Sequence, residues 1–151
     1  MKDSERKDIW LVVVNVFAAS KKAGSVWKKA AAMLEDAGVR YKAMFTGGKD
    51  NAIAISRKAS AKGYRKFIAV GGDGTVHDVL NGIAAFVDWT TENGGNIQLS
   101  EFTMGAIPVG SGNDWIKSIA VPKDVADAVD VLMDGTLKRQ DVVRVSLIDH
   151  Q

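Results

Sequence analysis

The sequence predicts an α/β fold in which a parallel sheet carries helices on both faces. Apolar runs typical of strands alternate along the chain with stretches whose apolar residues recur at helical spacing, and this alternation is typical of parallel sheets. The first run, Ile9 to Val14, is β-branched and almost uninterrupted, as expected of a strand covered on both faces. Two glycine-rich turns each follow such a run. We therefore expect both at the carboxyl edge of the sheet, where ligands of these folds bind.

The remaining elements follow from periodicity and from signals at their ends. Val26, Ala30 and Leu34 share one helical stripe, and Gly38 follows them in the usual role of glycine after a helix. Asp124 is placed to cap the last helix. The predicted strands are residues 9–14, 39–45, 66–70 and 105–109, and the predicted helices are residues 25–37, 50–62, 75–87 and 125–134.

Two stretches fit this pattern less well. Residues 88–102 contain Asn93-Gly94-Gly95-Asn96 and have weak periodicity, so we predict a loop or a short hairpin there. A connection of this length is unusual in a compact domain. Residues 140–148 alternate like a half-buried strand. We therefore divide the chain into a domain at residues 1–139 and a crossover strand at residues 140–151, leading towards a second domain that this sequence lacks.

Composition excludes several classes of function. The 20 basic and 18 acidic residues leave a formal charge of +2, and the basic residues are scattered, so we predict no nucleic-acid partner. The absence of cysteine excludes disulfides, thiolate catalysis and cysteine-ligated zinc. Because the two histidines are isolated, a metal cluster held by histidines is also improbable. The kind of metal that remains possible is a hard cation such as Mg²⁺, held by carboxylates and phosphate oxygens.

The N-terminus superficially resembles a signal peptide, because Lys2 to Lys7 precede the apolar run Ile9 to Ala19. Acidic residues interrupt the basic part and Asn15 interrupts the apolar part, so a buried first strand explains the run better. No segment of the sequence is long and apolar enough to span a bilayer. We therefore expect a cytoplasmic protein, with peripheral association at the inner membrane surface left open.

The two turns are Gly71-Gly72-Asp73-Gly74-Thr75 and Gly110-Ser111-Gly112-Asn113-Asp114. Glycine lets a backbone approach a ligand closely, and the N–H groups at a helix start favour anions. We therefore predict a phosphate-bearing ligand between the turns. The plainer alternative is a pair of tight connections, with Asp114 capping a short helix at residues 115–118. A Walker sequence, the dinucleotide fingerprint and a nucleophile elbow are all missing from the sequence.

The same turns carry a resemblance to a known family. Residues 71–83 closely resemble the signature of the diacylglycerol kinase catalytic domain, and residues 105–114 resemble the second block of that family. The superfamily includes bacterial diacylglycerol and related lipid kinases, sphingosine kinases and ceramide kinases. The first motif alone is shared, more loosely, with NAD kinases and phosphofructokinases, whereas the ordered pair is specific to the lipid kinases. The resemblance spans residues 15–141.

The resemblance implies a Rossmann-like, N-terminal nucleotide-binding domain of the NAD kinase and diacylglycerol kinase type, with ATP and Mg²⁺ as cofactors. The C-terminal β-sandwich domain, which in this family closes the cleft and supplies acidic residues, is absent from the sequence. Asp73 is the implied catalytic residue, acting on nucleotide and metal first and as a general base second. The implied cofactor-binding residues are Asn15, Thr46, Gly71, Gly72, Gly74, Thr75, Asp78, Gly110, Ser111, Gly112, Asn113 and Asp114.

This sequence departs from the family pattern at several positions. Val16 stands where the family usually has proline, and Ser111 where threonine is commoner. Asp78 stands where the family usually has glutamate, a carboxylate one methylene longer. We expect the lone His77 to be exposed rather than catalytic.

The resemblance predicts an enzyme that transfers the γ-phosphoryl group of ATP to a lipid hydroxyl at the membrane surface, most simply that of diacylglycerol. We expect these 151 residues alone to be inactive. Trp89 and Phe102 are expected to pack against the second domain or to face lipid. An NAD kinase-like enzyme is a rival, disfavoured by the second block and by Asn81 to Ile83, and a nucleotide-binding or regulatory module without activity is another. The identity of the lipid and a homodimeric state stay open.

Overall fold

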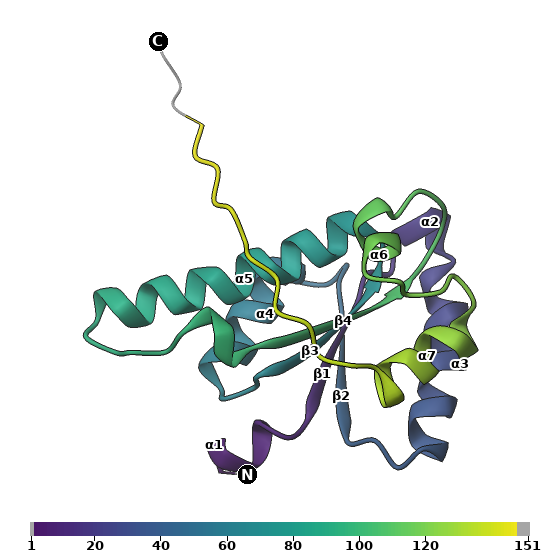
Figure 1. The fold of residues 1–151 in the computed structure, drawn as a ribbon, viewed down its shortest axis with the longest axis horizontal. Coiled ribbons are helices and arrows are strands. Elements are labelled where there is room, and N and C mark those ends of the chain that lie inside the picture. The colour runs from purple at the N-terminus through teal and green to yellow at the C-terminus, as the bar shows by residue number, and fades with distance from the viewer. Residues whose placement is uncertain (1, 148–151) are drawn as a thin grey trace.

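Four parallel strands form the sheet at the centre of the computed structural model, which describes residues 2–147 (Figure 1). The inner strands are β1 (Trp10–Val14) and β3 (Lys66–Gly71), and the outer ones are β2 (Tyr41–Phe45) and β4 (Thr103–Pro108), in the order β2-β1-β3-β4. The inner strands are almost wholly buried, as their uninterrupted apolar runs predict. The predicted parallel sheet is confirmed.

Helices cover both faces of this sheet, which confirms the predicted layers (Figure 1). The helices α4 (Ala52–Ala61) and α5 (Asp73–Glu92) pack on one face, and α3 (Ala23–Asp36) and α7 (Val125–Asp134) pack on the other. Alternate residues of each strand point to opposite faces, so Leu11 and Val13 join the first core cluster while Val12 and Val14 join the second. Among residues 2–147, none of the helices is long and apolar enough to cross a bilayer.

The stretch at residues 88–102 is more ordered than its weak periodicity predicts. The helix α5 continues to Glu92, and a 3-10 turn, η1 (Leu99–Glu101), precedes β4. Phe102 then packs on Phe67, with 6.2 Å between ring centroids, and the Arg65 guanidinium lies 4.8 Å from the Phe102 ring. Phe102 is therefore a core contact of this domain rather than a lipid-facing residue, while Trp89 is 53% exposed.

The strand predicted at residues 140–148 does not form over the described residues 140–147, which are neither helix nor strand. An isolated extended segment lacks the ladder of backbone hydrogen bonds that stabilises a strand, and the apolar side chains here stay exposed, Leu147 at 94%. One ion pair, Arg144 Nη2 to Asp88 Oδ2 at 2.8 Å, ties the segment to α5. Ile148 to Gln151 lie outside the described residues.

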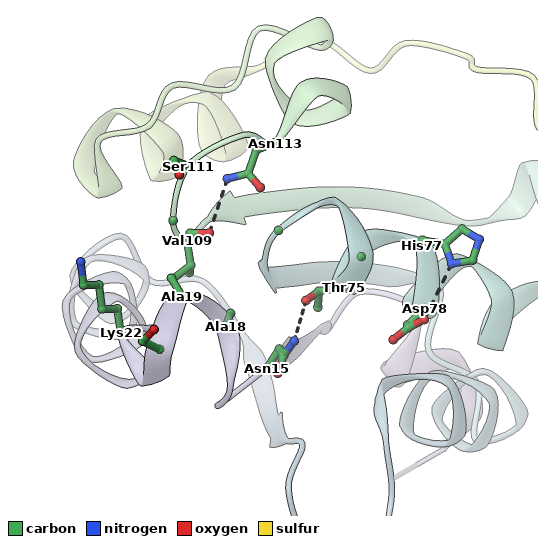
Figure 2. Close-up of a pocket in the computed structure, with 14 residues that line it drawn as sticks. Asn15, Ala18, Ala19, Lys22, Thr75, His77, Asp78, Val109, Ser111 and Asn113 are labelled. Carbon is green, nitrogen blue, oxygen red and sulfur yellow. Dashed lines mark hydrogen bonds and ion pairs between the residues drawn. The ribbon is translucent and has the colours of Figure 1, made fainter.

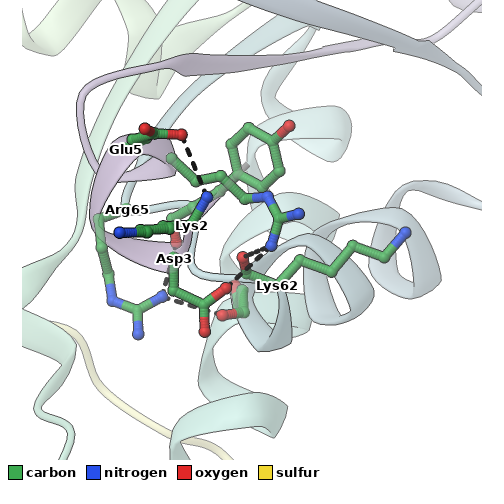
Figure 3. A network of polar contacts seen from close by, with 8 residues as sticks. Lys2, Asp3, Glu5, Lys62 and Arg65 are labelled. Carbon is green, nitrogen blue, oxygen red and sulfur yellow. Dashed lines mark hydrogen bonds and ion pairs between the residues drawn. The ribbon is translucent and has the colours of Figure 1, made fainter.

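A polar network joins the first helical turn, α1 (Asp3–Arg6), to the end of α4 (Figure 3). Arg6 Nη1 donates to Asp3 Oδ1 at 2.9 Å and to the Lys62 carbonyl at 2.8 Å. Arg65 Nη1 donates to the carbonyls of Ser60 and Tyr64 at 2.9 and 2.7 Å. Partial burial lowers the pKa of Arg65, although a guanidinium stays charged at neutral pH. These bonds tie the end of α4 to α1 and to the segment that leads into β3.

The contact between α4 and α5 depends on Gly82. A Cβ added there would meet the Ile53 carbonyl oxygen and, at 2.8 Å, Ser56 Cβ. We predict that Gly82→Ala lowers the free energy of unfolding by about 1–3 kcal/mol, because the backbone of α4 has to move. Urea unfolding followed by circular dichroism measures this change.

Gly24→Ala is the matched control, since it is also a glycine inside a helix and a Cβ there meets nothing within 4 Å. It should leave stability equal or raise it by up to about 1 kcal/mol. Equal midpoints for Gly82→Ala and the unsubstituted protein would show that the two helices are not in this tight contact.

Candidate functional site

An open pocket of about 960 Å³ lies where β1, β3 and β4 end. Its walls come from the segment after β1, from the first glycine turn with the start of α5, and from the second glycine turn (Figure 2). The structure therefore brings both turns to one edge of the sheet, as the parallel topology predicts. The predicted site residues that line the pocket are Asn15, Gly72, Gly74, Thr75, Asp78, Gly110, Ser111 and Asn113.

The remaining predicted residues lie beside the pocket without lining it, and Thr46 is the clearest case. Asn15 Nδ2 donates to Thr75 Oγ1 at 3.0 Å, and Asn15 Oδ1 accepts from Thr46 Oγ1 at 3.3 Å. Because Thr75 is only 3% exposed, its hydroxyl relies on Asn15 Nδ2 for a hydrogen-bond partner. Thr46 thus acts on the pocket through Asn15. The others that do not line it are Gly71, Asp73, Gly112 and Asp114.

The first turn is packed too closely for side chains at two of its glycines. A Cβ on Gly71 would lie 2.7 Å from Thr75 Cβ, and one on Gly72 would lie 2.8 Å from Asn113 Oδ1. Gly72 is the N-cap residue of α5, a helix of 20 residues. The first N–H groups of a helix have no partner within it and carry partial positive charge. Gly72 and Gly74 themselves line the pocket, so the start of α5 at this wall is suited to an anion.

The second turn runs through left-handed backbone into a short helix. Gly110 and Gly112 have φ values of 87° and 94°, and Asn113 has 49°, which glycine and asparagine tolerate best. The helix α6 (Asp114–Ser118) follows, close to the short helix expected at residues 115–118. Asp114 is the first residue of α6, and the N-cap position belongs to Asn113. The alternative in which Asp114 caps this helix is therefore wrong.

The cap of α6 comes from the first turn instead. Asp73 Oδ2 accepts a hydrogen bond from Trp115 N at 3.2 Å, and Asp73 Oδ1 accepts one from Ile116 N at 3.2 Å. The Asp73 carboxylate is half-buried between the two turns. The structure therefore places the candidate catalytic residue in a contact between backbone segments rather than on the pocket wall.

Of the wall after β1, only Asn15 is among the predicted site residues. The turn α2 (Ala18–Lys21) contains φ values of 47°, 56° and 71° at Ala19, Ser20 and Lys21, and such values strain residues other than glycine. Lys22, which follows the turn, lines the pocket across from Asp78 and His77 (Figure 2). Lys21 and Lys22 belong to neither glycine-rich motif. The signal that the sequence offers for them is position, since both lysines follow the carboxyl end of a buried strand.

Asp78 is the carboxylate that this pocket offers to a cation. Its side chain is 46% exposed, and its Oδ1 lies 3.7 Å from His77 Nδ1. His77 itself is 75% exposed, as expected. Among the described residues, no three acidic, histidine or cysteine side chains are grouped to hold a metal. Mg²⁺ is commonly bound by one or two carboxylates together with substrate phosphates, and a single carboxylate beside an anion site fits that arrangement.

A helix-covered parallel sheet with its pocket at the carboxyl edge defines an α/β ligand-binding domain. Comparison with known proteins makes the class specific. The chain belongs to the family described as the diacylglycerol kinase catalytic domain, whose sequence profile matches residues 9–145.

Individual relatives agree with that assignment. A diacylglycerol kinase of Staphylococcus saprophyticus is 30% identical over 113 residues, covering 75% of this chain and 33% of that protein. One from Staphylococcus epidermidis is 32% identical, covering 75% and 32%. The chain thus spans about a third of the length of these relatives. A crystal structure of a diacylglycerol kinase from Bacillus anthracis has the same fold, with a TM-score of 0.66, 23% identity, and coverage of 87% of this chain and 41% of that one.

The Asn15 contacts yield a stability prediction. We expect Asn15→Ala to lower the free energy of unfolding by about 1–3 kcal/mol, because it leaves the buried Thr75 hydroxyl without its partner. Denaturant unfolding measures the loss. Asn96→Ala, at an exposed loop position, should change stability by less than about 0.5 kcal/mol. A loss of equal size in both variants would argue against the Asn15 network.

Proposed function

We propose that this chain is the ATP-binding part of a lipid kinase that transfers the γ-phosphoryl group of ATP to a lipid hydroxyl, most simply that of diacylglycerol. The observation that carries the proposal is that Gly72 and Gly74, at the start of α5, line a pocket bounded by the second glycine turn. Membership of the diacylglycerol kinase catalytic domain family supports the same reaction class.

In this proposal the chain's own groups hold the phosphates. The N–H groups at the start of α5 bind phosphate oxygens, and Lys22 on the opposite wall offsets their charge. Asn15 keeps the Thr75 side chain in one orientation beside them. Mg²⁺, when bound, would neutralise part of the phosphate charge, and Asp78 is the residue placed to hold it, directly or through water.

Proteins catalyse phosphoryl transfer mainly by positioning the reacting groups and neutralising their charge. The described residues supply such groups on the walls of an open pocket. We propose that the acceptor lipid reaches the exposed side from a membrane surface, and that groups outside this chain complete that side. The chain spans about a third of its relatives' length. A nucleotide-binding module that transfers no phosphate by itself is therefore the second candidate for these 151 residues.

Gly74 offers a test of nucleotide binding that spares the fold. A Cβ there meets no protein atom within 4 Å, yet it would stand where phosphates approach the start of α5. We predict that Gly74→Ala keeps or raises thermal stability and weakens Mg-ATP binding at least about tenfold, measured by isothermal titration calorimetry. Gly24→Ala, at a position that does not line the pocket, should bind as tightly as the unsubstituted chain. If the unsubstituted chain shows no heat of binding with millimolar Mg-ATP, the ATP assignment fails.

The acceptor is tested in a protein that contains this chain together with the remainder found in its relatives. Labelled ATP is offered with diacylglycerol in mixed micelles and with NAD as competing acceptors. We predict label in the lipid and none in NAD, because the second turn matches the lipid kinase pattern. Label in NAD would favour the rival kinase, and ATP binding without transfer to any lipid of a panel would favour the module.

A further inference from the structure

The Asp73 carboxylate joins two segments that lie far apart in the sequence. Its two oxygens accept hydrogen bonds from the backbone N–H groups of Trp115 and Ile116, each at 3.2 Å. These are the second and third residues of α6. An N-cap side chain accepts hydrogen bonds from the backbone N–H groups of the second or third residue of a helix, so Asp73 caps α6. Here the cap is supplied from more than 40 residues away instead of by the residue preceding the helix.

The local sequence leaves this helix without a cap of its own. Asn113 occupies the N-cap position with φ of 49°, and its side chain makes no cap bond. Its amide donates to the Val109 carbonyl at 3.4 Å instead. A helix of five residues is far too short to be stable alone. Two contacts stabilise α6. The side chain of Ile116, which is 1% exposed, packs in the core, and the Asp73 carboxylate caps the start of the helix.

The same contact sets how closely the two glycine turns approach. Next to Asp73, Gly72 lies so near Asn113 that a Cβ would come within 2.8 Å of its Oδ1. The capped helix begins at Asp114, directly after the lining residues Ser111 and Asn113. Any movement of the start of α6 therefore moves the wall of the pocket that the second turn provides.

We infer that Asp73 is a positioning residue: by capping α6 it holds the second turn against the first and gives the pocket its width before a ligand arrives. This role for the pocket rests on the proposed nucleotide site, whereas the cap itself does not. A charged acceptor suits the role, because hydrogen bonds to a carboxylate are stronger than neutral ones. Both oxygens are already engaged, so taking up a substrate proton would weaken a bond that keeps the pocket in shape.

Amide hydrogen exchange in the ligand-free chain tests the cap directly. We expect Asp73→Ala to speed exchange at Trp115 and Ile116 at least about tenfold. Asp73→Asn keeps one acceptor oxygen and should give an intermediate rate. Asp124→Ala is the matched control, since Asp124 accepts from Ala126 N and Asp127 N at the start of α7. It should speed exchange at those two amides and leave Trp115 and Ile116 unchanged.

Mg-ATP titration of the same variants then tests positioning. Asp73→Ala should weaken binding at least about tenfold, with Asp73→Asn between it and the unsubstituted chain and Asp124→Ala within about twofold. Unchanged exchange at Trp115 and Ile116 in Asp73→Ala overturns the cap. Faster exchange with unchanged affinity leaves a cap that does not position the pocket, and overturns the inference.

The outcomes stay separable from those of the proposed function. If the unsubstituted chain does not bind Mg-ATP, the nucleotide site fails, while the exchange rates still decide whether Asp73 holds α6. If Asp73→Ala also loses protection in β3 and has unfolded, Asp73→Asn decides both questions. In that variant, rates and affinity equal to those of the unsubstituted chain would overturn the inference.

Discussion

The register of three parallel strands is the constraint on which the site depends. Val14 is the register partner of Val70, and Val70 is the partner of Ile107, so β1, β3 and β4 reach the carboxyl edge at the same level. The ladder continues into the loops, where Asn15 N donates to the Val70 carbonyl at 3.0 Å and Val109 N to the Gly71 carbonyl at 2.9 Å. A slip of one residue would exchange the side chains that face the two helical layers and would shift the three walls of the pocket relative to one another.

The sheet and the site are stabilised in different ways. The inner strands bury continuous apolar surface on both faces, a contribution that needs no directional bonds. At the carboxyl edge the contacts are single hydrogen bonds between loops, Asn15 to Thr75 and Asp73 to α6. Each such bond contributes little net free energy, but its loss leaves a polar group without a partner. Polar substitutions at this edge should therefore change the shape of the pocket before they unfold the sheet.

The sequence was sufficient for the features that local periodicity determines. The four strands and the main helices lie within a few residues of their predicted bounds, since burial on one or two faces leaves a repeating pattern. The missed features depend on distant partners. Phe102 packs on Phe67, a residue far away in the chain, and α5 continues to Glu92, beyond the predicted end at Val87. The segment 140–147 has a strand-like pattern without a strand beside it.

The candidate site divides in the same way. The two motifs marked both turns, and eight of the expected residues line the pocket. The sequence does not predict the pocket wall at Ala19 and Ser20, because left-handed backbone is normally marked by glycine and neither residue is a glycine. Asp73 belongs to the first motif, but its partners Trp115 and Ile116 lie just beyond the end of the second. No spacing rule links a carboxylate to the backbone of a helix that far along the chain.

The three glycines of the first turn have different physical reasons to be glycine. Gly71 makes room for Thr75, and Gly72 makes room for Asn113, so packing within the chain accounts for both. A Cβ on Gly74 would meet nothing within 4 Å outside the backbone of its own helix, although Gly74 lies in the first turn of that helix, where alanine would be more favourable by up to about 1 kcal/mol. Internal packing therefore leaves Gly74 unexplained, and a ligand that approaches the backbone from the pocket would explain it. Within this motif, Gly74 is the position whose glycine the fold does not explain and the proposed phosphate ligand would explain.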